Sequence, residues 1–111
     1  MNGLIVKPPW SQLILDGVKI MELRGNNTKI RGTIGIIESG TGKVFGTVDL
    51  VDCIKLSDED FKNSVSKHRV NPNDTIISYK NLYGWIFENP IRFDKPIPYV
   101  HKQGCVIWVH L

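Results

Sequence analysis

Residues 32–54, with the sequence GTIGIIESGTGKVFGTVDLVDCI, give the strongest indication of the fold. Two runs rich in β-branched residues, 32–39 and 43–54, flank Gly40-Thr41-Gly42, and this arrangement is typical of a β-hairpin. Gly-x-Gly also occurs in phosphate-binding loops, but these depend on the N-terminus of a following helix, and no helical pattern follows here. We therefore expect two antiparallel strands joined by a short turn.

Strand-like and helix-like segments lie on both sides of this hairpin. The strand-like segments are short alternating or β-branched runs at 3–6, 20–24, 83–88 and 105–111. Asn89-Pro90 ends the run at 83–88, and residues 91–93 are expected to form an edge after it. The helix-like segments are 9–17, 57–69 and 75–82. Gly17 ends the first of these segments, and a capping box of Ser57 and Asp60 begins the second. Strands dominate, so the sequence predicts a mainly β fold: a small, partly closed β-barrel of about six strands with two or three short helices.

The composition is that of an ordinary soluble domain. The chain has 111 residues, 41% of them hydrophobic, and no repeat or linker divides it, so we expect one domain over residues 1–111. Cys53 and Cys105 lie in apolar runs without the spacing of a zinc site, so we expect buried free thiols in an intracellular protein and no metal or other cofactor. No apolar stretch approaches the ~20 residues that cross a bilayer, and we expect a cytoplasmic protein without membrane contact.

The net charge of +3 is unevenly distributed along the chain. Residues 1–47 hold six Lys and Arg against three Asp and Glu, whereas residues 48–111 hold eight of each sign. This asymmetry favours an anionic partner, such as nucleic acid or a phosphorylated small molecule. The alternative is that these are solvated loop charges.

Residues 17–24, Gly-Val-Lys-Ile-Met-Glu-Leu-Arg, concentrate three charged side chains at a helix-to-strand junction. On a strand, Glu22 and Arg24 point to the same face and lie ~6.6 Å apart along the chain, so they can reach each other or hold one ligand between them. Charges that are buried together need partners, and functional sites are a common reason for retaining them. The alternative is a salt bridge of Glu22 with Lys19 or Arg24 that serves the structure alone.

At these residues the sequence resembles the ASCH domain family, which belongs to the PUA-like superfamily of β-barrels. The resemblance rests on the Gly-x-Lys-x-x-Glu-x-Arg pattern of 17–24 and on Lys7-Pro8-Pro9-Trp10 before it. It extends to 83–90 and to Pro98-Tyr99-x-His101, which are similar to the corresponding segments of small bacterial, single-domain members. The resemblance implies a PUA-like barrel with a cleft between the first helix and the sheet, suited to RNA or a nucleoside.

The resemblance also bears on chemistry. Most members of the family are thought to bind RNA, while some small bacterial members deacylate acetylated cytidine or cut RNA. In the deacylating members a Lys, a Thr nucleophile and a distant Glu act together; Lys19 matches the Lys, but Glu22 stands at the position of the Thr. An ionised carboxylate does not simply replace that hydroxyl, so this activity does not transfer directly to the present chain.

Each charged side chain of the motif suits a different part of a nucleotide. Arg24 offers a planar fork for phosphate or a base edge, and Lys19 offers a point charge for phosphate. Glu22 suits an exocyclic amine, as in the recognition of cytosine. As a general base, Lys19 would need a lowered pKa; Arg24 lowers this pKa while Glu22 raises it, and the opposing effects do not indicate catalysis.

Aromatic residues and Lys7 complete the set of candidate ligand-binding residues. Trp10 begins the first helix and either stacks on a base or anchors the helix in the core. Tyr83 and Trp85 lie on one face of a strand, and the same two interpretations apply to them.

The remaining residues carry weaker signals. His68 ends a charged helix, where an imidazolium favours the C-terminal dipole, so we expect it on the surface. His101 lies in a loop, at either the cleft or a turn, and His110 is expected to be exposed. Tyr79 and Lys80 are weaker candidates for the border of the cleft.

The sequence leaves three hypotheses for the function. The first is a binding module that recognises RNA, a nucleotide or a nucleoside-like ligand through Lys19, Glu22 and Arg24. The second is a small enzyme acting on RNA or modified nucleosides, an N4-acetylcytidine amidohydrolase or a ribonuclease, with Lys19 and Glu22 as catalytic residues. The third is a protein-interaction domain in which these charges form an internal salt bridge. The sequence names neither the ligand nor the oligomeric state.

Overall fold

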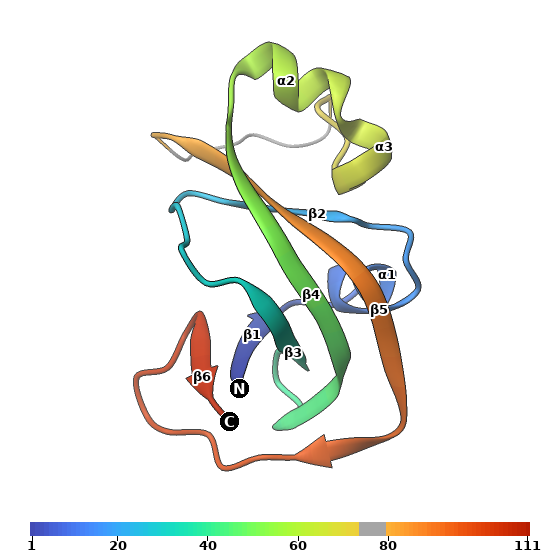
Figure 1. Ribbon diagram of the computed structural model, residues 1–111, viewed down its shortest axis with the longest axis vertical. Helices are drawn as coiled ribbons and strands as arrows, with labels where there is room; N and C mark the ends of the chain where they lie inside the picture. The colour runs from blue at the N-terminus through green and yellow to red at the C-terminus, as the bar shows by residue number, and fades with distance from the viewer. Residues whose placement is uncertain (74–79) are drawn as a thin grey trace.

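A computed structural model describes residues 1–73 and 80–111 of the chain. Within these residues the elements are β1 (Asn2–Val6), α1 (Trp10–Leu15), β2 (Met21–Arg24), β3 (Gly32–Glu38), β4 (Lys43–Leu56), α2 (Asp58–Asn63), α3 (Val65–His68), β5 (Leu82–Pro98) and β6 (Trp108–His110). The strands form one six-stranded sheet in the order β2-β5-β4-β3-β1-β6 (Figure 1).

The hairpin of β3 and β4 forms as predicted. The two strands pair antiparallel over residues 32–38 and 43–50, and Gly40 and Gly42 take positive φ angles of 85° and 68° in the turn between them. Glycine adopts this conformation without the steric cost of a Cβ atom. β4 also pairs along its whole length with β5, and these two are the longest strands of the sheet (Figure 1).

The sheet is mixed and open. β1 pairs parallel with β3 and antiparallel with β6, and the other strand pairs described are antiparallel. The edges are β2, with four residues, and β6, with three, and no pairing among the described residues joins them. The prediction of a mainly β fold with six strands and two or three short helices is confirmed, but the strands do not close into a barrel, because each short edge strand pairs with a single neighbour.

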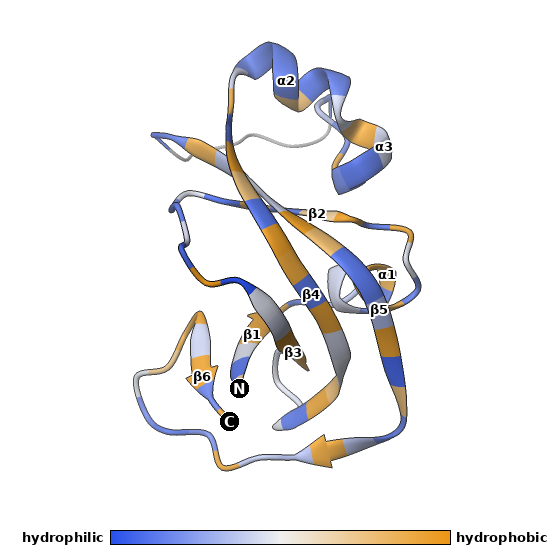
Figure 2. Ribbon diagram, in the orientation of Figure 1, coloured by the Kyte–Doolittle hydropathy of each residue, from blue (hydrophilic) through white to orange (hydrophobic). Residues whose placement is uncertain are grey.

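Apolar residues of the strands build the core, and they appear as orange bands along β4 and β5 in Figure 2. The largest cluster joins β1, α1, β3, β4 and β5, and Leu4, Ile36 and Leu50 within it are completely buried. Burial of a side chain of this size contributes about 1.5–3 kcal/mol. A second cluster packs Met21 of β2 with Phe61 of α2, which ties the helical end of the molecule to the sheet.

α1 positions the segment that leads to β2. The helix begins at Trp10, after Pro9, and Gly17 follows its end with a φ of 76°, as predicted. Ile14 and Leu15 are buried in the cluster that includes the sheet residues, so the helix packs against the sheet with its apolar face. The chain therefore enters β2 from a fixed helix.

The helix predicted over 57–69 is divided in two. Ser57 and Asp60 form the predicted capping box: each backbone N–H donates to the other side chain at 3.0 Å. The helix breaks at Ser64, whose φ of −111° lies outside the helical region, and α3 adds a single turn beyond it.

His68 is completely buried, so the prediction of a surface position was wrong. Its Nδ1 accepts the backbone N–H of Val70 at 2.9 Å, its Nε2 lies 2.8 Å from the Phe61 carbonyl oxygen, and its ring stacks on that of Phe61. Because Nδ1 accepts and Nε2 donates, the ring is neutral. Two backbone partners and a stacked ring stabilise the buried position more than the weak dipole of a four-residue helix stabilises an exposed imidazolium.

Three other segments differ from the predictions. β5 continues through Asn89-Pro90, because Asn89 takes a φ of 51° and the register with β4 shifts nearby. β6 is shorter than the run predicted over 105–111. Of the helix predicted over 75–82, residues 75–79 lie outside the described residues, and Leu82 begins β5.

Cys53 and Cys105 are free, as predicted, but they are half-buried rather than buried. Cys53 lies in the part of β4 that extends past its pairing with β3, and Cys105 lies in the loop before β6; each packs against the edge of a core cluster. His110 is exposed, as predicted. Among the described residues, no helix combines the length and the apolar character needed to cross a membrane.

Candidate functional site

The charged motif connects α1 to β2 and is held by backbone hydrogen bonds on both sides. The N–H of Lys19 donates to the Leu13 carbonyl at 3.0 Å. The N–H of Ile20 donates to the Lys67 carbonyl in α3, and the Ile20 carbonyl accepts the N–H of Phe87 in β5, both at 2.9 Å. These bonds fix the direction in which the Lys19 side chain leaves the backbone.

Lys19 is the most deeply buried charge of the motif, with 1% of its surface exposed. Its Nζ donates to the His68 carbonyl at 2.6 Å, lies 3.5 Å from Oε1 of Glu22, and lies 4.8 Å from the centre of the Trp10 ring. A carbonyl, a carboxylate and an aromatic face thus surround the ammonium group and offset its loss of hydration.

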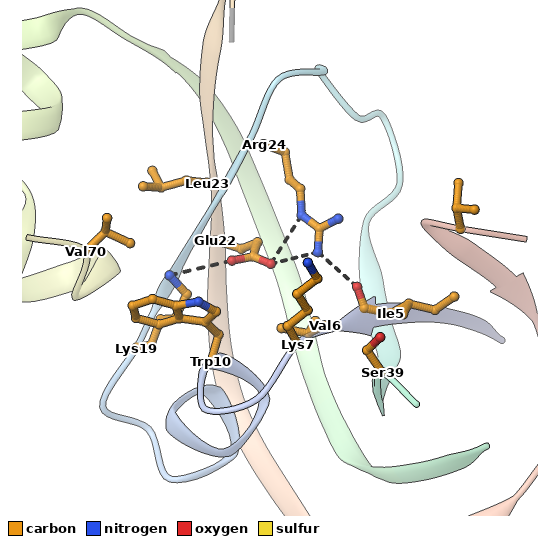
Figure 3. A pocket seen from close by; sticks show the side chains of 11 residues that line it. Ile5, Val6, Lys7, Trp10, Lys19, Glu22, Leu23, Arg24, Ser39 and Val70 are labelled. Carbon is orange, nitrogen blue, oxygen red and sulfur yellow. Dashed lines mark hydrogen bonds and ion pairs between the residues drawn. The ribbon is translucent and has the colours of Figure 1, made fainter. Parts of the chain in front are cut away.

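Glu22 holds two cations with one carboxylate. Its Oε2 accepts from Nε and Nη2 of Arg24 at 3.2 and 2.8 Å, while Oε1 faces Lys19 (Figure 3). Glu22 and Arg24 lie on the same face of β2, as predicted, and Met21 and Leu23 occupy the alternate positions in a separate apolar cluster. The strand period therefore brings the acid and the base together.

Arg24 is anchored through one edge of its guanidinium group. Besides its bonds to Glu22, Nη2 donates to the Ile5 carbonyl at 3.0 Å, and the guanidinium carbon lies 5.8 Å from the centre of the Trp85 ring. The side chain is 19% exposed, and among the described residues Nη1 has no hydrogen-bond partner. An anchored guanidinium with unused donors is suited to bind an anion.

Burial lowers the pKa of Lys19 below its ordinary value. The carboxylate of Glu22 acts in the opposite direction, and the positive charge of Arg24 lowers the pKa further. The two charge effects are those expected from the sequence. Burial, which is the largest cause, was not predictable from the motif, because it depends on α3 and on Trp10.

A cavity of about 390 Å³, here called the first cavity, opens beside this cluster (Figure 3). Its wall carries three basic side chains and one carboxylate, an excess of positive charge that favours an anion. The residues that line it are Ile5, Val6, Lys7, Trp10, Lys19, Glu22, Leu23, Arg24, Ser39, Val70 and Val106.

Most of the predicted ligand-binding residues meet at the first cavity. Those that line it are Lys7, Trp10, Lys19, Glu22 and Arg24, whereas Tyr83 and Trp85 do not. Trp85 is 2% exposed and its Nε1 donates to the Asn26 carbonyl at 3.0 Å. Tyr83 is half-buried and packs against the main core cluster. For both residues the structure favours the interpretation as core aromatics.

Six residues that line the first cavity were not among the predicted site residues. Ile5, Val6 and Leu23 adjoin predicted residues in the sequence, whereas the other three come from separate segments. Ser39 follows β3, Val70 follows α3, and Val106 precedes β6. The pairing of β1 with both β3 and β6 brings two of these segments to the cavity. The His68 carbonyl, which holds Lys19, was missed for the same reason: it comes from a segment distant in the sequence.

The weaker candidates lie elsewhere. His101 is exposed, with its Nδ1 2.9 Å from the Tyr99 hydroxyl, and it does not line the first cavity. Lys80 lines a different cavity, and Tyr79 lies outside the described residues. Within residues 1–73 and 80–111, no three side chains of His, Cys, Asp and Glu gather in a way that could hold a metal ion.

The fold and the site together define a class: a mainly β domain whose sheet carries a buried ionic cluster beside a small cationic cavity. The model of the ASCH domain family matches residues 4–97. Because the match spans most of the sequence, this chain belongs to the ASCH domain family, which is generally thought to bind RNA. The resemblance inferred from the motif is confirmed.

Solved structures show the same fold. The crystal structure of ASCH from Zymomonas mobilis aligns with a TM-score of 0.75 at 13% sequence identity, over 87% of this chain and 72% of that chain. A single-residue variant of that protein aligns with a TM-score of 0.76 at 13% identity, over 99% and 87% of the two chains. At this identity the likeness concerns the fold alone. A search of curated proteins found no significant match.

The charge of Glu22 should be essential for stability, because it faces two cations. Glu22→Gln keeps the shape of the side chain but leaves Lys19 and Arg24 without their carboxylate. We expect the free energy of unfolding to fall by about 3 kcal/mol or more, as when one partner of a buried ion pair is removed. Glu88→Gln removes the same charge from an exposed position of β5 and should have little effect. Denaturant unfolding of both variants measures this, and equal midpoints would contradict it.

His68 should make stability depend on pH. Burial lowers its pKa; the hydrogen bond to Phe61 raises it, and the charge of Lys19 lowers it. As the pH falls, the unfolded chain therefore binds a proton before the folded chain does. The contribution to stability is fully present above about pH 6.5, the ordinary value for histidine, and decreases below it by up to about 1.4 kcal/mol per pH unit.

Unfolding measured between about pH 7.5 and about pH 5.5 checks this expectation. His68→Gln cannot titrate in this range and should flatten the pH dependence. His110→Gln removes an exposed histidine and should leave the dependence as it is. A slope that persists in His68→Gln would show that another group is responsible.

Proposed function

We propose that this domain binds RNA, or a nucleotide-like part of it, in the first cavity. The observation that carries the proposal is the arrangement of Arg24. Glu22 and the Ile5 carbonyl hold its Nη2 edge, while the side chain borders the cavity and Nη1 has no partner among the described residues. A guanidinium fixed in this way offers donors to a phosphate at little entropic cost.

The charge and size of the first cavity agree with this ligand. Lys7, Lys19 and Arg24 outnumber the single carboxylate of Glu22, which favours an anion. The volume of about 390 Å³ is at the lower end of the range for small-ligand sites, about 300–1,000 Å³. A cavity of this size suits one nucleotide unit.

In this proposal each lining residue contacts a different part of the ligand. Arg24 binds a phosphate together with Lys7, whose amine extends toward the same part of the cavity in Figure 3. Trp10 supplies the ring for a base, a contact worth about 1–3 kcal/mol, in place of the buried Trp85. Oε1 of Glu22 accepts from an exocyclic amine.

Arg24→Ala should weaken RNA binding about tenfold or more, because a hydrogen bond to a charged group contributes about 1.5–3 kcal/mol. The slope of log K against log salt should decrease by about 0.7 for each phosphate of a single strand that the variant no longer neutralises. Arg24→Lys keeps the charge but loses the planar fork, so its affinity should be intermediate. Fluorescence anisotropy with a short single-stranded RNA at several salt concentrations measures both quantities.

The matched control is Arg31→Ala, which removes a half-exposed arginine that does not line the first cavity. It should leave affinity and salt slope close to those of the unaltered chain. Equal affinities for Arg24→Ala and the unaltered chain would reject the role of Arg24. A further variant replaces Glu22 and Arg24 together by apolar residues. If its stability changes but its affinity for RNA does not, the result would instead favour a structural salt bridge in an interaction domain.

The lowered pKa of Lys19 favours a second candidate, a small hydrolase acting on RNA or on modified nucleosides. A general base is most effective when its pKa lies near the working pH, and burial moves the pKa of Lys19 in that direction. Lys19 would act as the base, with Glu22 beside it at 3.5 Å.

Incubation with N4-acetylcytidine and with short RNAs tests this candidate. The enzyme hypothesis is supported if Lys19→Ala abolishes product formation and Lys29→Ala, at an exposed site, does not. Turnover no greater than that of Lys19→Ala would remove the enzyme hypothesis for these substrates. A melting temperature for each variant separates loss of catalysis from loss of fold.

A further inference from the structure

A larger cavity of about 820 Å³, here called the second cavity, adjoins the first at Arg24 and Val106, which line both. The loop after β2 supplies Asn26 and Asn27 to its wall, and the segment before β5 supplies Lys80 and Asn81. Trp108 of β6 also lines it. The cavity thus gathers three segments that are far apart in the sequence.

The polar groups of the second cavity suit a nucleotide. The three asparagines are exposed, and each amide offers donors and an acceptor of the kind that base edges and ribose hydroxyls require. Lys80 and Arg24 add positive charge, and no carboxylate is among the described residues that line the cavity. A ligand with hydrogen-bonding edges and negative charge therefore fits better than an apolar or a cationic one.

Two tryptophans give the second cavity a rigid aromatic wall. The rings of Trp85 and Trp108 stack with centres 5.6 Å apart and planes 12° apart, and the Trp85 indole is fixed by its bond to the Asn26 carbonyl. Trp85 is buried, whereas Trp108 is half-buried. The accessible part of Trp108 is thus held in place before any ligand arrives, as in sites that stack unpaired bases.

Arg24 lies at the border of the two cavities. Its guanidinium bonds to Glu22 and to the Ile5 carbonyl, which belong to the first cavity, and its central carbon lies 5.8 Å from the ring of Trp85, which belongs to the second. A cation in this position can contact the phosphate that links a unit in one cavity to a unit in the other.

We propose that the second cavity binds the neighbouring nucleotide of a single-stranded RNA whose linking phosphate contacts Arg24. This inference rests on the proposed function of the first cavity and extends it. Trp108 contacts the second base, the asparagines bind its edge or its ribose, and Lys80 contacts the outer phosphate. Because each cavity receives a separate base, the bases must be unpaired, and the ligand has at least two nucleotides.

Calorimetric titration with uridine 5′-monophosphate and with the dinucleotide pUpU tests the proposal. We expect pUpU to bind about tenfold more tightly than the monophosphate, as a single additional base contact allows. Lys80→Ala and Asn81→Ala, both at exposed positions, should reduce this preference severalfold. Lys95→Ala, an exposed lysine of β5 that lines neither cavity, should leave the preference unchanged.

The outcomes separate the two proposals. If the monophosphate binds in a way that needs Arg24 but pUpU binds no more tightly, the second subsite is overturned and the proposal for the first cavity stands. A preference for pUpU that Lys80→Ala and Asn81→Ala do not change would also overturn the assignment, because the second nucleotide would then lie elsewhere. Failure of the unaltered chain to bind either compound would overturn both proposals. Melting temperatures of the variants exclude a loss of fold as the cause.

Discussion

The carboxylate of Glu22 is the interaction on which the rest of the site depends. It lies between Lys19, which is 1% exposed, and Arg24, whose guanidinium it binds through two nitrogens. A buried ammonium group without a counter-charge would lose its proton or destabilise the fold. The same carboxylate orients Arg24 at the cavity wall. One acid thus lets the fold tolerate a buried cation and holds a second cation where a ligand can reach it.

The rest of the fold holds these three side chains in position. The Ile20 backbone is hydrogen-bonded to α3 on one side and to β5 on the other, so the motif cannot rotate about its own strand. The His68 ring bonds to two backbone groups, and its own carbonyl receives Lys19. The short helices are therefore part of the site, because they fix the acceptor that the buried lysine needs.

Local patterns in the sequence were sufficient to predict the parts of the structure that arise from neighbouring residues. The alternation over 20–24 predicted that Glu22 and Arg24 share a face, and Gly40-Thr41-Gly42 predicted the hairpin. The capping box of Ser57 and Asp60 marked the start of α2. Each of these features depends on residues a few positions apart.

Features that depend on distant segments could not be predicted in this way. The contact of Lys19 with the His68 carbonyl spans 49 positions, so neither the burial of the lysine nor that of the histidine had a local signal. The parallel pairing of β1 with β3 and the open edges of the sheet follow from the order of the strands, which alternation does not reveal. Trp85 is buried with its indole N–H donating to a carbonyl in the loop after β2, and this partner is also distant in the sequence.

The most direct test of the central claim is an experimental structure of the domain with a short single-stranded RNA. If Glu22 holds Arg24 ready for a ligand, a phosphate oxygen will lie about 3 Å from Nη1 of Arg24, and the bonds from Arg24 to Glu22 will persist. An RNA bound on another face, or an Arg24 that leaves Glu22 to reach it, would contradict the account.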